Sequence, residues 1–351
     1  IQDLETTSMF KMPVVIVLDN GKISRHSFWI DGPQATISIP SSTKPKMVLF
    51  DEGNQIPKKL TFKKSISELK YQLENAPHIL DRISAAKDLG KGPLRRKAQK
   101  ALESAIISDP FWGVRLAAVD AYVDLKPKNG AETLITMSTG QDNRVRRACI
   151  RGLRIYEDDQ DAGLFLEGII KNDSSYYAVA DAIGALVKVD STAANDLLEL
   201  ALNMNSHQDV IRKAALRAMG KIHTEENFNR LFSAAEYGGT TWEARSTAVS
   251  SLRSYADSHS EVLEQAIVFL EDPNYGVRRS AVDLVGQFGN KSHFTALDDL
   301  VQLDPMQSRN VQRAKERILK KDKDGDKEAL IKENRQLKEL LDDIRKILEQ
   351  N

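Results

Sequence analysis

Two patterns of apolar and polar positions divide the chain near residue 62. Before it, short apolar runs alternate with turn residues. The run Val14–Leu18 is apolar on both faces and precedes Asp19–Lys22, which is typical of a hairpin turn. Further runs follow at Phe28–Ile30, Ala35–Ile39 and Lys46–Phe50, a spacing of about ten residues that is common in β-sandwiches. Residues 1–62 are therefore predicted to form an antiparallel β-sandwich segment of four short strands.

A repeat begins after residue 63. A large apolar residue, here called the anchor, recurs eight times at successive spacings of 33, 31, 33, 33, 33, 33 and 33 residues. The anchors are Leu89, Tyr122, Leu153, Leu186, Met219, Leu252, Val285 and Ile318. The residue four positions before each anchor, here called the small position, is alanine in every unit but one. These residues are Ala85, Ala118, Cys149, Ala182, Ala215, Ala248, Ala281 and Ala314.

This pattern predicts stacked pairs of helices. Residues four apart share one helix face, so the small position admits a neighbouring helix and the anchor fills the space beside it. A unit of about 33 residues cannot bury its apolar face alone, whereas stacked copies form a continuous core. We predict a mainly α fold, an α-α superhelix of about eight repeats over residues 63–320, preceded by the β segment.

Arginine recurs seven residues before six of the eight anchors, and Val179 and Val311 take the other two places. An arginine at this position leaves the core face, so we expect it to reach carboxylates or carbonyls of the next unit. Asp109–Pro110 and Asp272–Pro273 lie thirteen residues before their anchors, where turn and N-cap chemistry should start a helix.

Residues 321–351 are predicted to form a charged linker and a C-terminal helix. The apolar seam from Leu330 to Leu348 has heptad spacing, with Asn334 in the seam. Two interpretations stay open: a terminal helix that docks on or extends the solenoid, and a seam that dimerises.

Carboxylates in this tail follow the spacing of a calcium-binding loop; they are Asp322, Asp324, Asp326, Glu328 and Glu333. Lys327 occupies the place where such a loop needs glycine for its positive φ. A charged linker that caps the last helix is the favoured interpretation, and weak calcium binding stays open.

The charge balance bears on possible partners. Lys plus Arg and Asp plus Glu are 50 each, so there is no global basic field for nucleic acid or an anionic membrane. The basic clusters Arg144–Arg147 and Arg278–Arg279 contain the repeat's own arginines, and Arg95–Lys97 is the third. No apolar run approaches the ~20 residues that span a bilayer. We expect a soluble protein, cytoplasmic or periplasmic, with no nucleic-acid or membrane partner.

Catalytic motifs are not found. No two of the six histidines are four residues apart, as a two-histidine zinc helix requires, and there is no phosphate loop, serine elbow or Cys-Xaa-Xaa-Cys. Cys149 stands in a small position and is interpreted as a buried hydrophobe. We predict no catalytic, cofactor-binding or metal-binding residue in this chain.

The helical units resemble HEAT repeats in length and in their arginine, alanine and leucine positions. The N-terminal segment resembles the third, β-sandwich domain of the aminopeptidase N family of zinc metallopeptidases. That resemblance rests on Gln2, Met9–Ile16, Trp29–Ile30 and Pro45–Asp51. Leu69–Leu73 and Asp81–Leu89 are similar to that family's entry into its helical C-terminal domain, most of all in bacterial members with HEAT repeats.

The resemblance implies a non-catalytic C-terminal part of an aminopeptidase that removes N-terminal amino acids from peptides. Zinc would belong to an upstream catalytic domain, and the first residue, Ile1, fits a chain that is a piece of a longer protein. The solenoid would enclose the substrate chamber and stabilise the catalytic domain, so its partners would be that domain and peptide substrates. Two alternatives stay open: a HEAT scaffold that binds a protein on its concave face, and a catalytically dead relative of the peptidases.

Overall fold

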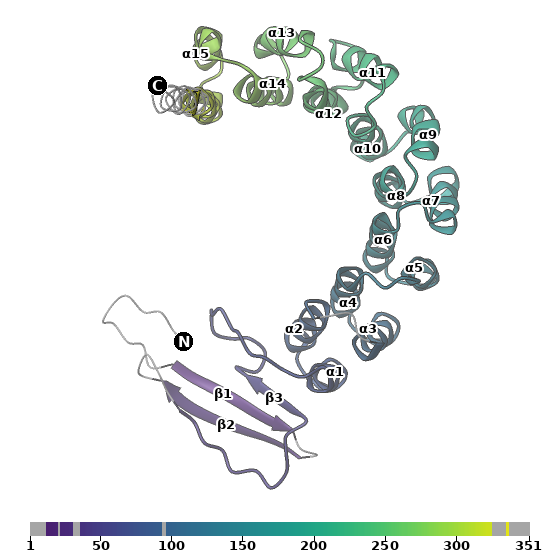
Figure 1. Cartoon of the computed structure of the whole chain (residues 1–351), viewed down its shortest axis with the longest axis vertical. Helices are drawn as coiled ribbons and strands as arrows, with labels where there is room; N and C mark the ends of the chain where they lie inside the picture. The colour runs from purple at the N-terminus through teal and green to yellow at the C-terminus, as the bar shows by residue number, and fades with distance from the viewer. Residues whose placement is uncertain (1–11, 20–21, 31–35, 93–95, 325–334, 337–351) are drawn as a thin grey trace, which may run out of the picture. The chain divides into compact units, whose positions relative to one another are not determined.

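The computed structural model describes residues 12–19, 22–30, 36–92, 96–324 and 335–336 (Figure 1). The chain divides into two compact units, residues 1–193 (unit 1) and 194–351 (unit 2). Unit 1 contains β1 (Met12–Asp19), β2 (Ile23–Ile30), β3 (Met47–Phe50), α1 (Ile66–Asn75), α2 (Ile79–Gly90), α3 (Arg96–Ser108), α4 (Trp112–Leu125), α5 (Gly130–Ser138), α6 (Asn143–Gly152), α7 (Gln160–Asn172) and α8 (Tyr176–Val189). The boundary falls in α9 (Ser191–Asn203), and unit 2 continues with α10 (Val210–Met219), α11 (Glu225–Ala235), α12 (Trp242–Ser251), α13 (Glu261–Val268), α14 (Tyr275–Phe288), α15 (Phe294–Leu303) and helical residues 308–324.

The strands form one antiparallel sheet in the order β2-β1-β3. Val14 faces Phe28 across β1 and β2, and Leu18 faces Val48 across β1 and β3. The prediction is confirmed for three of the four strands. It is wrong for residues 36–39, which are not in a strand. Alternation of Ile37 and Ile39 was the signal there, but prolines, which lack an N–H for strand pairing, lie on both sides of the run.

The sheet is attached to the first helix of unit 1, α1. Met47 and Leu49 of β3 are buried against Ala76, at the end of α1, with Tyr71 packed beside them. The Tyr71 hydroxyl donates to Asp19 Oδ2 at 3.0 Å, which connects α1 to the end of β1. These contacts make the sheet and the first helices a continuous part of one unit.

Within each unit the helices form two layers (Figure 1). In unit 1, α2, α4, α6 and α8 form one layer, here called the even layer, and α1, α3, α5 and α7 form the odd layer. In unit 2 the even layer is α10, α12, α14 and helical residues 308–324. All eight anchors and all eight small positions are at most 2% exposed, on the even helices or the short 3-10 turns that end them. The predicted repeat is therefore confirmed.

The recurring arginines link neighbouring repeats. Four of them pair with an aspartate that lies 26 or 27 residues later, in the odd-to-even turn of the next repeat. These pairs are Arg82–Asp109, Arg146–Asp173, Arg245–Asp272 and Arg278–Asp304. Each aspartate also accepts a backbone N–H two residues further along the chain. The pair thus fixes the turn and the repeat spacing together. The prediction that the arginine reaches a carboxylate of the next repeat is confirmed for these four.

Two arginines depart from this arrangement. Arg115 Nη1 donates to the Asp109 carbonyl at 2.8 Å, and Arg212 Nε donates to the Leu202 carbonyl at 2.8 Å, both within their own repeats. The residue 27 positions after Arg212 is Gly239, which has no carboxylate. The residue 27 positions after Arg115 is Asp142, but its carboxylate pairs with Arg144.

The paired aspartates also displace the expected helix starts. α4 and α14 begin close to the predicted turns, but their N-cap residues are Phe111 and Asn274 instead of Asp109 and Asp272. The aspartate carboxylates are already occupied by arginine and by the turn N–H groups. Asn274 then caps α14 by accepting from the Gly276 N–H at 2.8 Å.

These arginine–aspartate pairs are here called the ladder, and removing one member of its most buried pair should lower the free energy of unfolding. Arg245 and Asp272 have side chains only 3% and 6% exposed. Arg245→Ala leaves the Asp272 charge buried without its partner, so we expect a loss of about 3–5 kcal/mol of unfolding free energy. The matched control is Arg230→Ala, which removes exposed pairs with Glu199 and Glu226 and should change stability by about 1 kcal/mol or less. Urea denaturation followed by circular dichroism measures both, and equal losses would contradict the proposed role of the ladder.

Two glycines of unit 1 should respond oppositely to alanine. A Cβ on Gly90 would lie 2.8 Å from the Cα and Cβ of Ala121 on the next even helix, so Gly90→Ala should destabilise by about 1–3 kcal/mol. Nothing lies within 4 Å of a Cβ on Gly184 in α8, so Gly184→Ala should stabilise by up to about 1 kcal/mol through helix propensity. Thermal melts of the two variants compare the signs. The close approach of α2 and α4 would be disproved by an unchanged melting temperature for Gly90→Ala.

Candidate functional site

The described ranges contain no group of three or more histidine, cysteine, aspartate or glutamate side chains placed to hold a metal ion. Cys149 is fully buried, and burial raises the pKa of its thiol to about 12. His259 Nε2 lies 3.3 Å from Glu225 Oε2, and its ring packs on Phe228 at a centroid distance of 3.8 Å. The contacts of this histidine are those of a side chain that holds the α11 turn in place.

The Cys149 thiol should be unreactive in the folded chain. At pH 8 a thiol with a pKa near 12 is ionised in only about one molecule in ten thousand, and burial also blocks access. We expect iodoacetamide labelling to be at least about a hundredfold slower in native protein than in urea-unfolded protein. Mass spectrometry of timed samples measures the rates. Rapid native labelling would contradict the assignment of Cys149 to a core position.

Two predictions for the tail concern residues that are mostly outside the described ranges. Asp322 and Asp324 end the helical residues 308–324, and Asp322 pairs with Lys291 at 3.1 Å. Asp326, Glu328 and Glu333, and the heptad seam from Leu330 to Leu348, lie outside the described residues. Calcium binding, the terminal linker and the dimerising seam therefore stay predictions.

The arginines of α6 are paired with carboxylates of unit 1. Asp181 of α8 accepts hydrogen bonds from Arg147 Nε at 2.6 Å and Arg151 Nη1 at 3.1 Å, both on α6. Arg144 pairs with Asp142 and lies 3.5 Å from the ring centroid of Trp112. The hydrogen bond from Arg144 holds the pKa of the Asp142 carboxyl well below its usual range. The basic cluster at Arg144–Arg147 is therefore occupied by contacts within unit 1.

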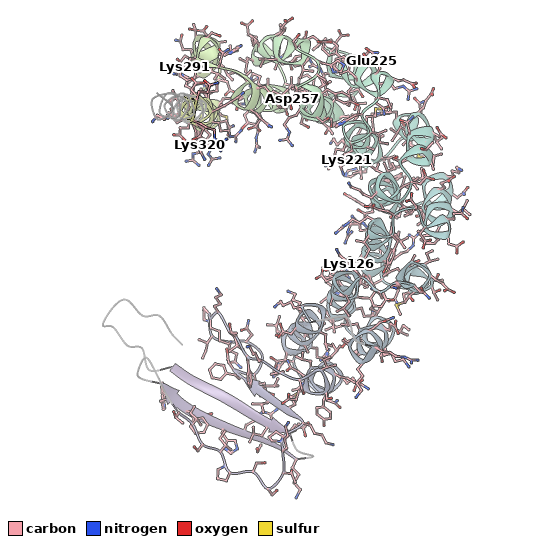
Figure 2. The ribbon with its side chains drawn as sticks, viewed as in Figure 1. Lys126, Lys221, Glu225, Asp257, Lys291 and Lys320 are labelled. Carbon is pink, nitrogen blue, oxygen red and sulfur yellow. The ribbon has the colours of Figure 1, made fainter. Side chains whose placement is uncertain are left out.

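The even layer of unit 2 contains a pocket of about 340 Å³. It is lined by α10, α12 with the 3-10 turn that follows it, and α14. Three cations line it, namely Arg217, Lys221 and Arg253, together with Ser250, Ser254 and Asp283. Figure 2 labels Lys221, just beyond the end of α10. We call this the even-layer pocket; no motif in the sequence had indicated it.

A larger pocket of about 960 Å³ lies between α9 and α11 of unit 2. It includes Arg212 and Gly239, the two positions at which the arginine–aspartate ladder is interrupted. The charged groups around it are paired: Arg230 contacts Glu199 and Glu226, and Arg212 contacts Asp209. Both arginines that line this larger pocket are therefore paired with carboxylates.

The odd-to-even turns of unit 2 expose large apolar side chains. The ladder pairs join the start of each even helix to the odd-to-even turn of the next repeat. Successive turns therefore lie along one edge of unit 2, and these side chains follow that edge. They are Tyr237, Trp242, Val268, Tyr275, Leu303 and Met306, between 41% and 79% exposed. Such an edge is suited to contact with another protein surface.

Comparisons with known proteins agree with this architecture. The family described as HEAT repeats matches residues 99–187, about a quarter of the chain. Aminopeptidase A of Legionella pneumophila, solved with aspartic acid, is structurally similar with a TM-score of 0.53 and 11% identity, over 88% of this chain and 45% of that one. The chain thus spans less than half the length of that enzyme. No curated protein matches the sequence.

Two further solved structures have lower scores. The CpcE–CpcF complex of phycocyanin lyase from Nostoc has a TM-score of 0.39 and 18% identity, over 75% of this chain and 97% of that chain. Human deoxyhypusine hydroxylase with glycerol has a TM-score of 0.33 and 15% identity, over 73% and 94%. At these scores neither bears on the argument. Residues 99–187 match HEAT repeats, and the remaining helices continue the same two-layer arrangement. Among the described helices, none combines the length and the apolar composition that a membrane span requires.

Proposed function

We propose that this chain is the non-catalytic C-terminal part of a zinc-dependent aminopeptidase, with HEAT repeats that enclose the substrate chamber and stabilise the catalytic domain. The observation that carries the proposal is the likeness to Legionella aminopeptidase A, a protein in which the matching region is 45% of the chain. At 11% identity that likeness establishes only the fold. The link to peptidase function is therefore ours.

Two further observations support the proposal. The similarity covers 88% of this chain, more than residues 63–351 alone could supply, so it includes part of the β segment. A β-sandwich segment followed by helical repeats is the domain order that the family resemblance of the N-terminal residues implies. The contacts of Tyr71 with Asp19, and of Ala76 with Met47 and Leu49, join these two parts closely.

The native protein provides the test. An antibody against this chain would capture the polypeptide from its source, whose mass, zinc content and hydrolysis of aminoacyl-coumarin amides are then measured. We expect a polypeptide roughly twice the length of this chain, one zinc ion, and hydrolysis that a chelator abolishes, because catalysis would come from a two-histidine zinc site elsewhere in the protein. A native polypeptide without zinc and without turnover would reject the peptidase assignment.

A second candidate function is a HEAT scaffold that binds a protein partner without any peptidase. The exposed apolar edge of unit 2, with Trp242 at 53% and Met306 at 79% exposure, favours it. HEAT repeats supply extended binding surfaces of this kind. The same capture experiment separates the two functions, since a scaffold would be recovered with a stoichiometric partner and no zinc.

A further inference from the structure

The three cations of the even-layer pocket lie outside the recurring arginine position of the repeat, and they differ from Arg245 and Arg278 of the same unit in forming no ion pair among the described residues. Arg245 and Arg278 have carboxylate partners. Within the described part of the chain, Arg217, Lys221 and Arg253 are exposed and form no ion pair. The pocket therefore brings three unpaired cations together on one face of unit 2.

Asp283 does not neutralise this group. It is the one carboxylate among the pocket's lining residues, and it lies 3.1 Å from Nη1 of Arg317 on helical residues 308–324. Three cations and this one carboxylate line the pocket, and the carboxylate has its own cation partner, so the pocket retains an excess of positive charge.

Comparison of equivalent repeat positions shows why Arg217 is unpaired. Arg217 is two repeats after Arg151, and Thr247 is two repeats after Asp181. In unit 1, Asp181 neutralises Arg151 across the even layer at 3.1 Å. In unit 2 the equivalent residue, Thr247, is buried and uncharged, so Arg217 lacks the carboxylate partner that Arg151 has.

The pocket walls are small and polar. Ser250 and Ser254 donate to the carbonyls of Thr247 and Ser251, both at 3.0 Å, so their hydroxyl groups are held near the pocket surface. Side chains of this size leave the space between α10 and α14 open, and hydroxyls can redirect their protons to an anion. Helix dipoles alone favour a cation near the ends of α10 and α12, but they give no reason for three cations to share one pocket.

We propose that the even-layer pocket binds a phosphate monoester dianion. Two arginines can donate in fork geometry to its oxygens, the lysine contributes a third positive charge, and the serines add neutral donors. A pocket of about 340 Å³ accommodates a phosphoryl group with a small organic substituent or one phosphorylated side chain. The proposal concerns this chain alone and does not depend on peptidase activity.

Calorimetric titration of the full chain at low ionic strength tests the site, because salt screens exposed charges. The probes are phenyl phosphate, inorganic phosphate, a phosphoserine peptide and acetate. We expect saturable binding of the phosphate probes and no saturation with acetate. A phosphoserine peptide that binds about tenfold more tightly than phenyl phosphate would identify a peptide source, and equal affinities would identify a small molecule.

Variants locate the binding. Arg217→Gln and Arg253→Gln should each weaken phenyl phosphate binding at least about tenfold, since each removes a charged donor. Ser250→Asp places a carboxylate beside the cations and should abolish binding without removing one of them. Arg96→Gln, an exposed arginine of α3 in unit 1, is the control and should bind normally. Circular dichroism confirms that each variant is folded.

Three results would overturn the proposal. These are no saturable binding of any phosphate probe, acetate binding as tight as phosphate, and equal weakening by Arg96→Gln and Arg217→Gln. The last would show that the chain's general charge, and not this pocket, attracts the anion.

Discussion

The close approach of neighbouring even helices at the small positions is the contact on which the other features depend. Alanine, or Cys149 in one repeat, is buried at every small position, as is the anchor four residues later. The closeness of the helices is seen at Gly286, where a Cβ would lie 2.7 Å from the Cβ of Ala314, a small-position residue of the next even helix. Larger residues there would force the helices apart. The same approach places four of the six recurring arginines beside the turn of the following repeat, so the arginine–aspartate pairs depend on the spacing that the apolar contact sets.

The arginine–aspartate pairs require desolvation of two charges, and in return they specify which turn residue faces which helix. Burying Arg245 and Asp272 removes both charges from water, and the two ladder bonds, together with carbonyls of Ala235 and Glu236, compensate for that loss. An apolar pair would hold the repeats together without specifying which turn residue faces which helix. Where the aspartate is absent, at Gly239, Arg212 turns back to its own repeat and the large pocket lies alongside.

The repeat could be predicted because its period is visible at every anchor, and burial at all sixteen anchor and small positions follows from it. The strand expected near Ile37 and Ile39 rested on alternation alone, which does not show whether a partner strand exists. The ladder aspartates were not assigned to their arginines in advance, because a separation of 26 or 27 residues does not match the repeat length. The even-layer pocket could not be predicted for a related reason: no sequence motif marks a cation whose neighbour in the fold is uncharged.

The difference between a paired Arg151 and an unpaired Arg217 shows how one repeat fold can present surfaces of different charge. Arg151 of unit 1 and Arg217 of unit 2 occupy equivalent positions of the repeat. The position of Asp181, the partner of Arg151, is occupied in unit 2 by Thr247, which is buried and uncharged, so it fills the core without pairing with Arg217. A net charge of zero over the chain conceals this, since it sums over both units. In a repeat protein the binding surface is thus decided by the positions that vary between repeats, and those positions are free to vary because the anchors and small positions carry the stability.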